Sequence, residues 1–248
     1  MTKVILITGG SRGIGAATAR MAAQRGYDVC ISYRRDEQAA ERVLEDIRGY
    51  GRDALAVRAD VADESDVLRL FAECEQHLGT PRALVNNAGI LERQCRLEEM
   101  DADRLQRVFN VNVIGTLLCS REAVRRMSTA LGGDGGALVN VSSRAACLGS
   151  PDEYVDYAAS KGAVDSLTVG LAKEVGGAGI RVNAVRPGVI YTDIHASGGE
   201  PDRVERVKST IPMRRGGTAE EVASAIMWLL SDEASYTTGS FLEVSGGR

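Results

Sequence analysis

Two tyrosines and a lysine in the segment "EYVDYAASKG" (153–162) are residue types that can transfer protons. A free phenol has a pKa near ~10, so it exchanges protons near neutral pH only if its surroundings change that value. On a helix, Tyr157 and Lys161 share a face about 6 Å apart along the axis, whereas Tyr154 lies about 10.5 Å from Lys161. Because a nearby ammonium favours the phenolate, the spacing selects Tyr157 as the acid or base and predicts a lowered pKa for it.

The stretch "TGGSRGIG" (8–15) has the composition of a phosphate-binding turn. It follows an apolar run and precedes an alanine-rich helical pattern, with the spacing GxxxGxG. Glycines at 9, 13 and 15 permit a tight turn and close backbone approach, and the start of the helix offers unpaired N–H groups to a pyrophosphate. The context predicts that a dinucleotide binds here.

The end of the second predicted strand, "SYRRDE" (32–37), bears on which dinucleotide binds. Tyr33 occupies the position where an acidic residue would grip the ribose of NAD, and Arg34 and Arg35 follow it. Arg12 in the glycine turn adds a further guanidinium. Because arginines pair well with phosphate and no carboxylate stands at this strand tip, the sequence favours NADP(H). NAD(H) remains possible through the acidic residues at 36–37.

Short apolar runs alternate with helical patterns along almost the whole chain. Strands are predicted at 3–8, 28–33, 54–60, 83–89, 136–143, 180–188 and 240–247. Helices are predicted at 13–26, 36–51, 64–79, about 101–130, 154–175 and 219–231, and 189–217 is expected to be irregular or short-helical. This alternation predicts one doubly wound α/β domain over 1–248, a Rossmann fold with seven parallel strands and helices on both faces.

Composition narrows the classes of protein further. The chain has 248 residues and a formal net charge of -4, which gives no basic field for nucleic acid or an anionic membrane. The opening apolar run is too short for a signal sequence or a membrane span, so a cytoplasmic protein is expected. Its few cysteines and histidines are scattered and form no CxxC pair, which predicts reduced thiols and no metal site. They are Cys30, Cys74, Cys95, Cys119, Cys147, His77 and His195.

Taken in order along the whole chain, the motifs resemble those of the short-chain dehydrogenase/reductase family. The motifs are "TGGSRGIG" at 8–15, Asp60-Val61, "NNAG" at 86–89, Asn112 within "NVNVIG", "NVSS" at 140–143, "YAASK" at 157–161, "RVNAVRPG" at 181–188 and Thr192. Each is short, but their joint order and spacing are specific.

The resemblance implies an enzyme that transfers hydride between NADP(H) and a carbonyl or secondary alcohol. It implies that Tyr157 is the general acid/base and that Ser143 hydrogen-bonds the substrate oxygen. Lys161 would lower the pKa of Tyr157 and bind the nicotinamide ribose, and Asn112 would hold a water in a proton relay to Lys161. This agrees with the chemistry, since charge develops on oxygen as hydride reaches a carbonyl carbon.

Neighbouring residues compete for some of these roles. Ser142 could replace Ser143, because adjacent strand residues point to opposite faces, and Asn110 competes with Asn112 in the same way. The family's spacing selects Ser143 and Asn112. Asp60 resembles the family residue beside the adenine ring, although it could equally cap the following turn.

The cofactor contacts expected from the glycine turn and from the resemblance lie at the ends of the predicted strands. They are Gly9, Ser11, Arg12, Gly13, Ile14, Gly15, Tyr33, Arg34, Arg35, Asp60, Val61, Asn87, Ala88, Gly89, Tyr157, Lys161, Pro187, Gly188, Ile190 and Thr192.

The resemblance leaves substrate and assembly less defined. Specificity is expected in the loops near 91–100, 144–154 and 189–215, with a mobile lid over about 189–217. Tyr154 is expected to form a wall of the substrate pocket, and His195 to be a surface-loop residue. The family's subunit contacts imply a homotetramer. An NAD-dependent sugar or polyol dehydrogenase and a non-catalytic dinucleotide sensor are the alternative functions.

Overall fold

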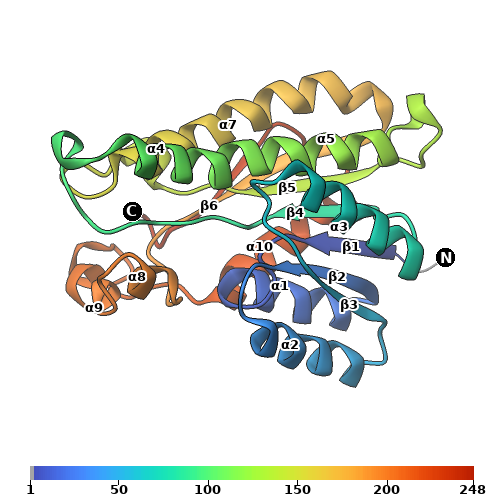
Figure 1. Ribbon diagram of the computed structural model, residues 1–248, viewed down its shortest axis with the longest axis horizontal. Coiled ribbons are helices and arrows are strands. Elements are labelled where there is room, and N and C mark those ends of the chain that lie inside the picture. Colours follow the sequence, from blue (N-terminus) through green and yellow to red (C-terminus); the bar gives the residue numbers. More distant parts are fainter. Residues whose placement is uncertain (1–2) are drawn as a thin grey trace.

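A parallel sheet forms the middle layer of the computed structural model, which describes residues 3–248 (Figure 1). Within that range the sheet has seven strands in the order β3-β2-β1-β4-β5-β6-β7. The strands are β1 (Lys3–Ile7), β2 (Tyr27–Tyr33), β3 (Ala54–Arg58), β4 (Ala83–Asn86), β5 (Gly136–Val141), β6 (Ile180–Pro187) and β7 (Phe241–Val244). The predicted fold class is confirmed, and the first two residues of the predicted domain lie outside the described range.

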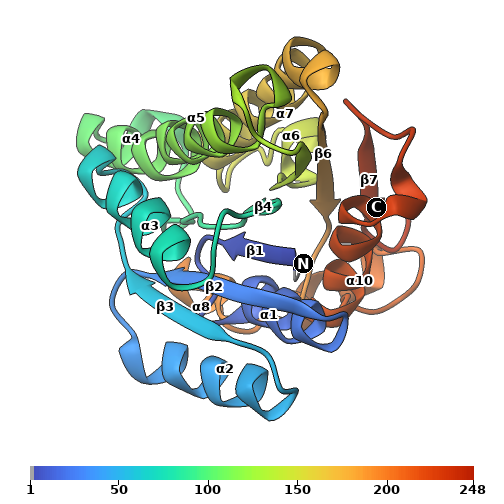
Figure 2. The same cartoon turned by 90° about the vertical axis from the view of Figure 1, so that its right-hand side faces the viewer.

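Helices cover both faces of this sheet (Figures 1 and 2). The helices are α1 (Gly13–Gln24), α2 (Glu37–Gly49), α3 (Glu64–His77), α4 (Ala102–Phe109), α5 (Gly115–Met127), α6 (Ala145–Leu148), α7 (Val155–Val175), α8 (Ile194–Ser197), α9 (Arg203–Val207) and α10 (Ala219–Leu230). One apolar core lies between the sheet and α1, α2 and α10, and a second lies between the sheet and α3, α5 and α7. Strands buried on both faces explain the unbroken apolar runs in the sequence.

The strand order places a cavity at the centre of the carboxyl edge. The chain builds outward from β1 through β2 to β3, then returns to build from β4 in the other direction. The loops after β1 and β4 therefore diverge and leave a crevice between them, which is where ligands bind in sheets of this kind. Figure 1 shows α8 and α9 near this edge of the sheet.

The long helix predicted at about 101–130 is observed over 102–127, but it contains a wide turn that the sequence did not indicate. It consists of α4 and α5, joined by a π-helical turn, η2 (Asn110–Ile114). A Cβ at Gly115 would lie only 2.7 Å from Val61 Cγ2, so this part of the helix packs very closely on the loop after β3. Wide turns of this kind are frequent at functional sites, and this one contains the buried Asn112.

Smaller differences occur at the predicted ends of elements. The last strand is shorter than the predicted 240–247, because the chain turns at Gly246 and Gly247, both with positive φ. The loop at 144–154 contains the short helix α6. The expectation for 189–217 is confirmed, since the segment holds α8, α9 and the 3-10 turn η5 (Lys208–Thr210) between irregular stretches.

Candidate active site

A cavity of about 620 Å³ opens at the carboxyl edge of the sheet. We call residues 8–15 and 86–89 its glycine half, and the loops at 91–100 and 144–154 with the segment 189–217 its loop half. Every residue predicted to touch the cofactor lines this cavity except Gly15. Of the four predicted catalytic residues, Ser143, Tyr157 and Lys161 line it and Asn112 does not.

The glycine half forms a cradle that leaves no room for side chains. Gly9 and Gly13 have φ values of +65° and +54°, which disfavour other residues. A Cβ at Gly15 would lie 2.4 Å from the Gly9 carbonyl oxygen, so Gly15 lets the first turn of α1 pack closely against the glycine turn. Within the described part of the chain, no side chain caps α1 and its first turn holds no acidic residue. The exposed backbone N–H groups and the positive helix end therefore fit the pyrophosphate of a dinucleotide.

The end of β4 holds this cradle in place. The Asn87 side chain donates hydrogen bonds to the carbonyl oxygens of Thr8 and Gly9, both at 2.9 Å. The Thr8 hydroxyl accepts hydrogen bonds from the backbone N–H groups of Asn87 and Ala88, both at 3.0 Å. Asn87 thus positions the glycine turn from a neighbouring strand.

The surroundings of Arg34 contradict the expectation that no carboxylate stands at the tip of β2. Asp60, which follows β3, pairs with the Arg34 guanidinium at 2.8 Å, so a carboxylate does reach the tip of β2. Asp60 also accepts a hydrogen bond from the Ala62 N–H at 3.1 Å, as expected of a residue that caps the following turn. Asp36 is occupied as the cap of α2, where it accepts from the Ala39 N–H.

Ser142 and Ser143 differ in their hydrogen-bond partners, and this difference distinguishes their roles. Both serines line the cavity, but the Ser142 hydroxyl is buried and donates to Asp165 of α7 at 2.6 Å. The Ser143 hydroxyl accepts from the Ala145 N–H at 3.1 Å. It lies close enough to the Tyr157 phenol to oppose part of the rise in the pKa of that phenol. The structure therefore places Ser143 beside Tyr157.

The expected lowering of the Tyr157 pKa is not found in this structure. Burial raises the pKa of Tyr157 to about 12, and the Ser143 hydroxyl offsets only part of this effect. Burial also lowers the pKa of Lys161 to about 8, although the Asp165 carboxylate opposes this change. The Lys161 ammonium donates to the Val141 carbonyl oxygen at 2.7 Å and lies 5.6 Å from the centre of the Tyr157 ring. Loss of water around each group is the largest cause of its pKa shift.

Asn112 fixes the loop after β4 from behind the cavity. Its side-chain oxygen accepts from the Ile90 N–H at 2.8 Å. Its amide nitrogen donates to the Ile90 carbonyl oxygen at 3.1 Å and to the Ser160 hydroxyl at 3.0 Å. Both amide hydrogens thus have protein partners, and the predicted role of Asn112 in holding a water stays a prediction. Asn110, the alternative, is exposed.

Comparisons with known proteins identify the family of this chain. A model of the family described as Enoyl-(Acyl carrier protein) reductase matches residues 9–248. "Uncharacterized oxidoreductase YgfF" of Escherichia coli (strain K12) is 59% identical over 245 residues, covering 99% of this chain and 99% of that protein. The chain belongs to the short-chain dehydrogenases/reductases.

Two solved structures of this family are similar over their whole length. A short chain dehydrogenase from Burkholderia cenocepacia J2315, in complex with NADP, has a TM-score of 0.90 at 35% identity, covering 99% of this chain and 97% of that one. The 3-ketoacyl-(acyl-carrier-protein) reductase from Brucella melitensis, complexed with NADH, has a TM-score of 0.91 at 35% identity, covering 99% and 98%. This short-chain dehydrogenase/reductase is therefore an oxidoreductase.

Residues 3–248 contain no helix that is long and apolar enough to cross a membrane. Nor do three or more histidine, cysteine or acidic side chains gather anywhere in that range in a way that could hold a metal ion.

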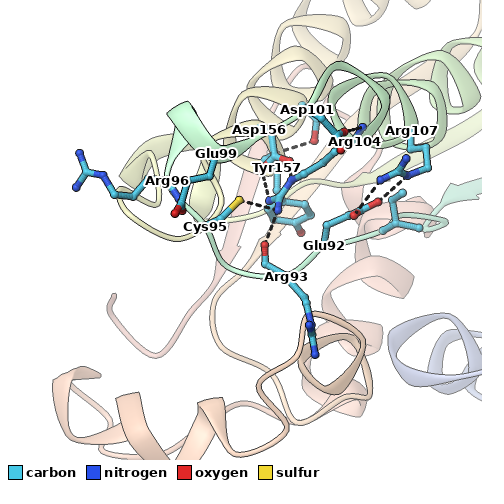
Figure 3. Close-up of polar contacts among 12 residues, drawn as sticks. Glu92, Arg93, Cys95, Arg96, Glu99, Asp101, Arg104, Arg107, Asp156 and Tyr157 are labelled. Atoms are coloured by element: carbon cyan, nitrogen blue, oxygen red, sulfur yellow. Dashed lines mark hydrogen bonds and ion pairs between the residues drawn. The ribbon is translucent and has the colours of Figure 1, made fainter.

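A buried ion pair that the sequence analysis missed fixes the start of α7 (Figure 3). The Arg104 guanidinium, from α4, donates to Asp156 at 2.8 and 3.2 Å, and both side chains are almost fully buried. It also donates to the Arg93 carbonyl oxygen at 2.5 Å and to Cys95 Sγ at 2.9 Å. Since Asp156 directly precedes Tyr157, Arg104 holds the first turn of α7 against the loop at 91–100.

His195 is not the surface residue that was expected. Its ring lies in the wall of the cavity, and Nε2 lies 3.0 Å from the Ile190 carbonyl oxygen. Burial and the positive charge of Arg203 lower the pKa of His195. Tyr154, expected in the pocket wall, lines the cavity with only 3% of its surface exposed. The Arg203 guanidinium lies 5.1 Å from the centre of the Tyr154 ring.

Four charged side chains connect the elements of the loop half. We call Glu153, Glu200, Arg203 and Arg206 the loop-half ion cluster. Arg203 pairs with Glu153 at 2.5 Å and with Glu200 at 3.0 Å. Arg206 also pairs with both glutamates. Gln94 extends the network by donating to Glu200 at 2.5 Å, so all three segments of the loop half are joined.

Proposed function

We propose that this protein is an NADP(H)-dependent oxidoreductase that interconverts a carbonyl compound and a secondary alcohol, with Tyr157 as the general acid/base. The observation that carries the proposal is the position of Ser143, Tyr157 and Lys161 in the wall of one cavity. The rest of that cavity is the glycine half, whose shape and unpaired N–H groups fit a dinucleotide.

The raised pKa of Tyr157 supports the role of this residue as an acid. With a pKa of about 12, the phenol is protonated at neutral pH and can donate its proton to a substrate oxygen. The Ser143 hydroxyl beside it donates a second hydrogen bond to the same oxygen as negative charge develops there. The bound cofactor supplies the hydride in this direction and accepts it in the reverse direction.

Lys161 contributes a positive charge behind the phenol. As its pKa is about 8, its amine is cationic at neutral pH, and this charge favours the tyrosinate left after proton donation. Its bond to the Val141 carbonyl oxygen fixes the ammonium at the end of β5. The same ammonium is the group we expect to bind the nicotinamide ribose.

NADPH binding and turnover provide the first test of this function. Purified protein should bind NADPH and oxidise it in the presence of at least one member of a broad panel of ketones, aldehydes and keto thioesters. Binding of NADPH without turnover on any panel member, in either direction, would favour the non-catalytic sensor. Absence of any dinucleotide binding would reject the proposal.

Arg34 supports the choice of NADP(H) over NAD(H), together with Arg12 and Arg35, which also line the cavity. Arg34 uses its Nε atom for Asp60, so its outer nitrogens remain for a phosphate. We expect Arg34→Ala to weaken NADPH about tenfold and NADH little, because one phosphate contact is lost. Arg48→Ala, an exposed residue of α2 paired with Glu41, is the control. An unchanged preference would instead support an NAD-dependent sugar or polyol dehydrogenase.

An exposed apolar strip bears on how copies of the chain assemble. Phe109, Ile114 and Leu117 form an exposed apolar strip over α4, η2 and α5, with 38–43% of each residue accessible. This strip supports contact between copies of the chain, and we propose a homotetramer. Light scattering coupled to gel filtration would test the assembly.

We also propose that 189–217 moves as a lid, which hydrogen exchange with and without NADPH would test.

A further inference from the structure

Tyr157, the proposed general acid/base, stands in the part of α7 that the helix itself holds least. The helix begins at Val155, so Tyr157 lies in its first turn. Backbone N–H groups in the first turn of a helix have no partner inside the helix, and this turn depends on caps or on contacts with other elements. Among residues 3–248, no side-chain cap is formed at the start of α7. The position of Tyr157 is therefore fixed from outside the helix.

Side chains from α4 and η2 hold this turn. At its start, Arg104 donates to both carboxylate oxygens of Asp156, and Figure 3 shows this pair with Tyr157 next in the chain. At its end, Asn112 donates to the Ser160 hydroxyl, which donates to the Tyr157 carbonyl oxygen at 2.7 Å. A planar guanidinium on a carboxylate restricts rotation as well as distance, so Arg104 defines the direction of the turn more strictly than a chain of single hydrogen bonds.

Burial leaves the Arg104–Asp156 pair little room to rearrange. Arg104 is 7% exposed and Asp156 is 4% exposed. Each guanidinium nitrogen of Arg104 has a partner, since the third nitrogen donates to the Arg93 carbonyl oxygen and to Cys95 Sγ. Apolar residues of similar volume often stabilise a protein core at least as well as a buried ion pair. The pair is therefore better explained by the orientation that it imposes than by the stability that it adds.

The pair acts from outside the cavity. Neither Arg104 nor Asp156 lines it, and the two loop residues that Arg104 binds, Arg93 and Cys95, do not line it either. An effect of the pair on the reaction must then pass through a neighbour that does line the cavity, and Tyr157 is the next residue in the chain. Displacement of a reacting group by about 1 Å can cost about 10²-fold in rate, so the orientation of this turn matters for proton transfer.

We propose that Arg104 is a positioning residue, which acts through Asp156 to hold the Tyr157 phenol at the oxygen atom that receives its proton. This inference rests on the proposed function. Arg104 neither donates the proton nor binds a ligand. Its loss should therefore slow the chemical step and leave NADPH binding unchanged.

Replacement of both partners tests this role without leaving a buried charge. In the double variant Arg104→Met with Asp156→Leu, apolar side chains of similar shape take the place of the ion pair, so the melting temperature should be retained. The assay uses a carbonyl compound that the wild-type protein reduces. We expect kcat at saturating substrate to fall about tenfold to a hundredfold, and the NADPH dissociation constant to change by less than about twofold.

Asp156→Asn tests the same contact with a smaller change. It keeps the volume of the side chain and the bonds from Arg104 to the loop at 91–100, but it replaces one of the two accepting oxygens with an amide group that cannot accept. We expect kcat to fall about threefold to tenfold, again with little change in NADPH binding.

The Tyr157→Phe background distinguishes positioning of the phenol from general loosening of α7. If the pair acts through the phenol, replacing the pair in this background should lower the residual rate by less than about twofold. Equal loss in both backgrounds would show a general structural role and would overturn the inference. Arg107→Met is the matched control, because Arg107 also lies on α4 and pairs at 2.9 Å with Glu92 of the same loop rather than with α7. It should change kcat by less than about twofold.

The remaining outcomes separate this inference from the proposed function. A folded double variant with kcat within about twofold of wild type overturns the inference, as does an equal loss in Arg107→Met. Both results leave the proposed function intact. If the double variant does not fold, Asp156→Asn decides the question, and full activity of that variant overturns the inference. Failure of the wild-type protein to reduce any carbonyl compound overturns both.

Discussion

The two halves of the cavity are held together by different kinds of contact. In the glycine half the backbone is packed so closely that a Cβ at Gly9 would lie 3.0 Å from Ala88 Cα, and neutral hydrogen bonds from Asn87 complete it. In the loop half, charged side chains such as Arg203 and Glu153 join segments that are far apart in sequence. The first half is fixed by close approach of the backbone, and the second by side chains that can separate.

This difference has a consequence for mutation. The backbone of the glycine half leaves no room for an added atom, so even a small substitution there should disrupt binding of the dinucleotide. Partly exposed ion pairs contribute less to stability and are screened by salt, so substitutions in the loop half should have smaller effects. The following predictions test this division, in decreasing order of expected effect.

Tyr157→Phe, at the boundary between the two halves, should have the largest effect. Removing the phenol hydroxyl should lower kcat by about 10²–10⁴-fold, since the only change is loss of the proton donor. Binding of NADPH, followed by fluorescence titration, should change by less than about twofold. Comparable turnover in the variant would show that another group donates the proton, and equal loss of binding would show that Tyr157 mainly supports the cofactor.

Gly15→Ala should damage the glycine half. The new Cβ would lie 2.4 Å from the Gly9 oxygen and 2.5 Å from the Asn87 amide nitrogen, so the turn must shift. We expect the free energy of unfolding to fall by about 1–3 kcal/mol, and the NADPH dissociation constant to rise about tenfold or more. Thermal melting and titration would measure these changes.

Gly162→Ala is the matched control, because Gly162 also lies in a helix but a Cβ there would meet nothing within 4 Å. Replacing it should raise the free energy of unfolding by about 0.5–1 kcal/mol. If both alanine variants behaved alike, the glycine half would not be fixed by close packing.

The pH profile should report the charge on Lys161. This group is cationic below its pKa of about 8 and neutral above it, so the positive charge behind Tyr157 is lost as pH rises. We expect kcat/KM for carbonyl reduction to be constant below about pH 8 and to decrease above it, approaching tenfold per unit. Initial rates between pH 6 and 10 at saturating NADPH would show this. A profile that is flat across that range would contradict the assignment.

Glu153→Gln should loosen the loop half with a smaller effect. It removes the partner that joins Arg203 and Arg206 to the loop at 144–154. We expect KM for the carbonyl substrate to rise about threefold to tenfold, with a smaller change in kcat and little change in NADPH affinity. Lys208→Gln, which breaks only the exposed pair with Glu205 inside the same segment, should stay within about twofold. Equal effects of the two variants would mean that the loop-half ion cluster does not join the segments.

The glycine half was predicted well from sequence because its determinants are local. The turn at 8–15 is read directly from its glycines, and its position between β1 and α1 follows from an apolar run and a helical pattern. The parallel direction of the strands also follows from their alternation with helices. By contrast, Asn87 could be placed near this turn from sequence, but not its bonds to the Thr8 and Gly9 oxygens.

The loop half was predicted less well because its contacts join residues distant in sequence. Arg104 and Asp156 are 52 positions apart, and neither lies in a recognisable motif. His195 was predicted to be a surface-loop residue, yet it lines the cavity, where the charge of Arg203 acts on its ring. The π-helical turn at 110–114 was missed because a single wide turn leaves almost no trace in helical periodicity.

The sequence by itself determined the doubly wound sheet, the glycine turn and the pairing of Tyr157 with Lys161, since each depends on short-range pattern and strand order. Only the tertiary structure decided that the Ser142 hydroxyl bonds Asp165 while Ser143 lies beside Tyr157, and that burial raises the Tyr157 pKa. It also decided that Asp60 reaches Arg34. Burial and long-range contact depend on how the whole chain packs, and no local pattern encodes them.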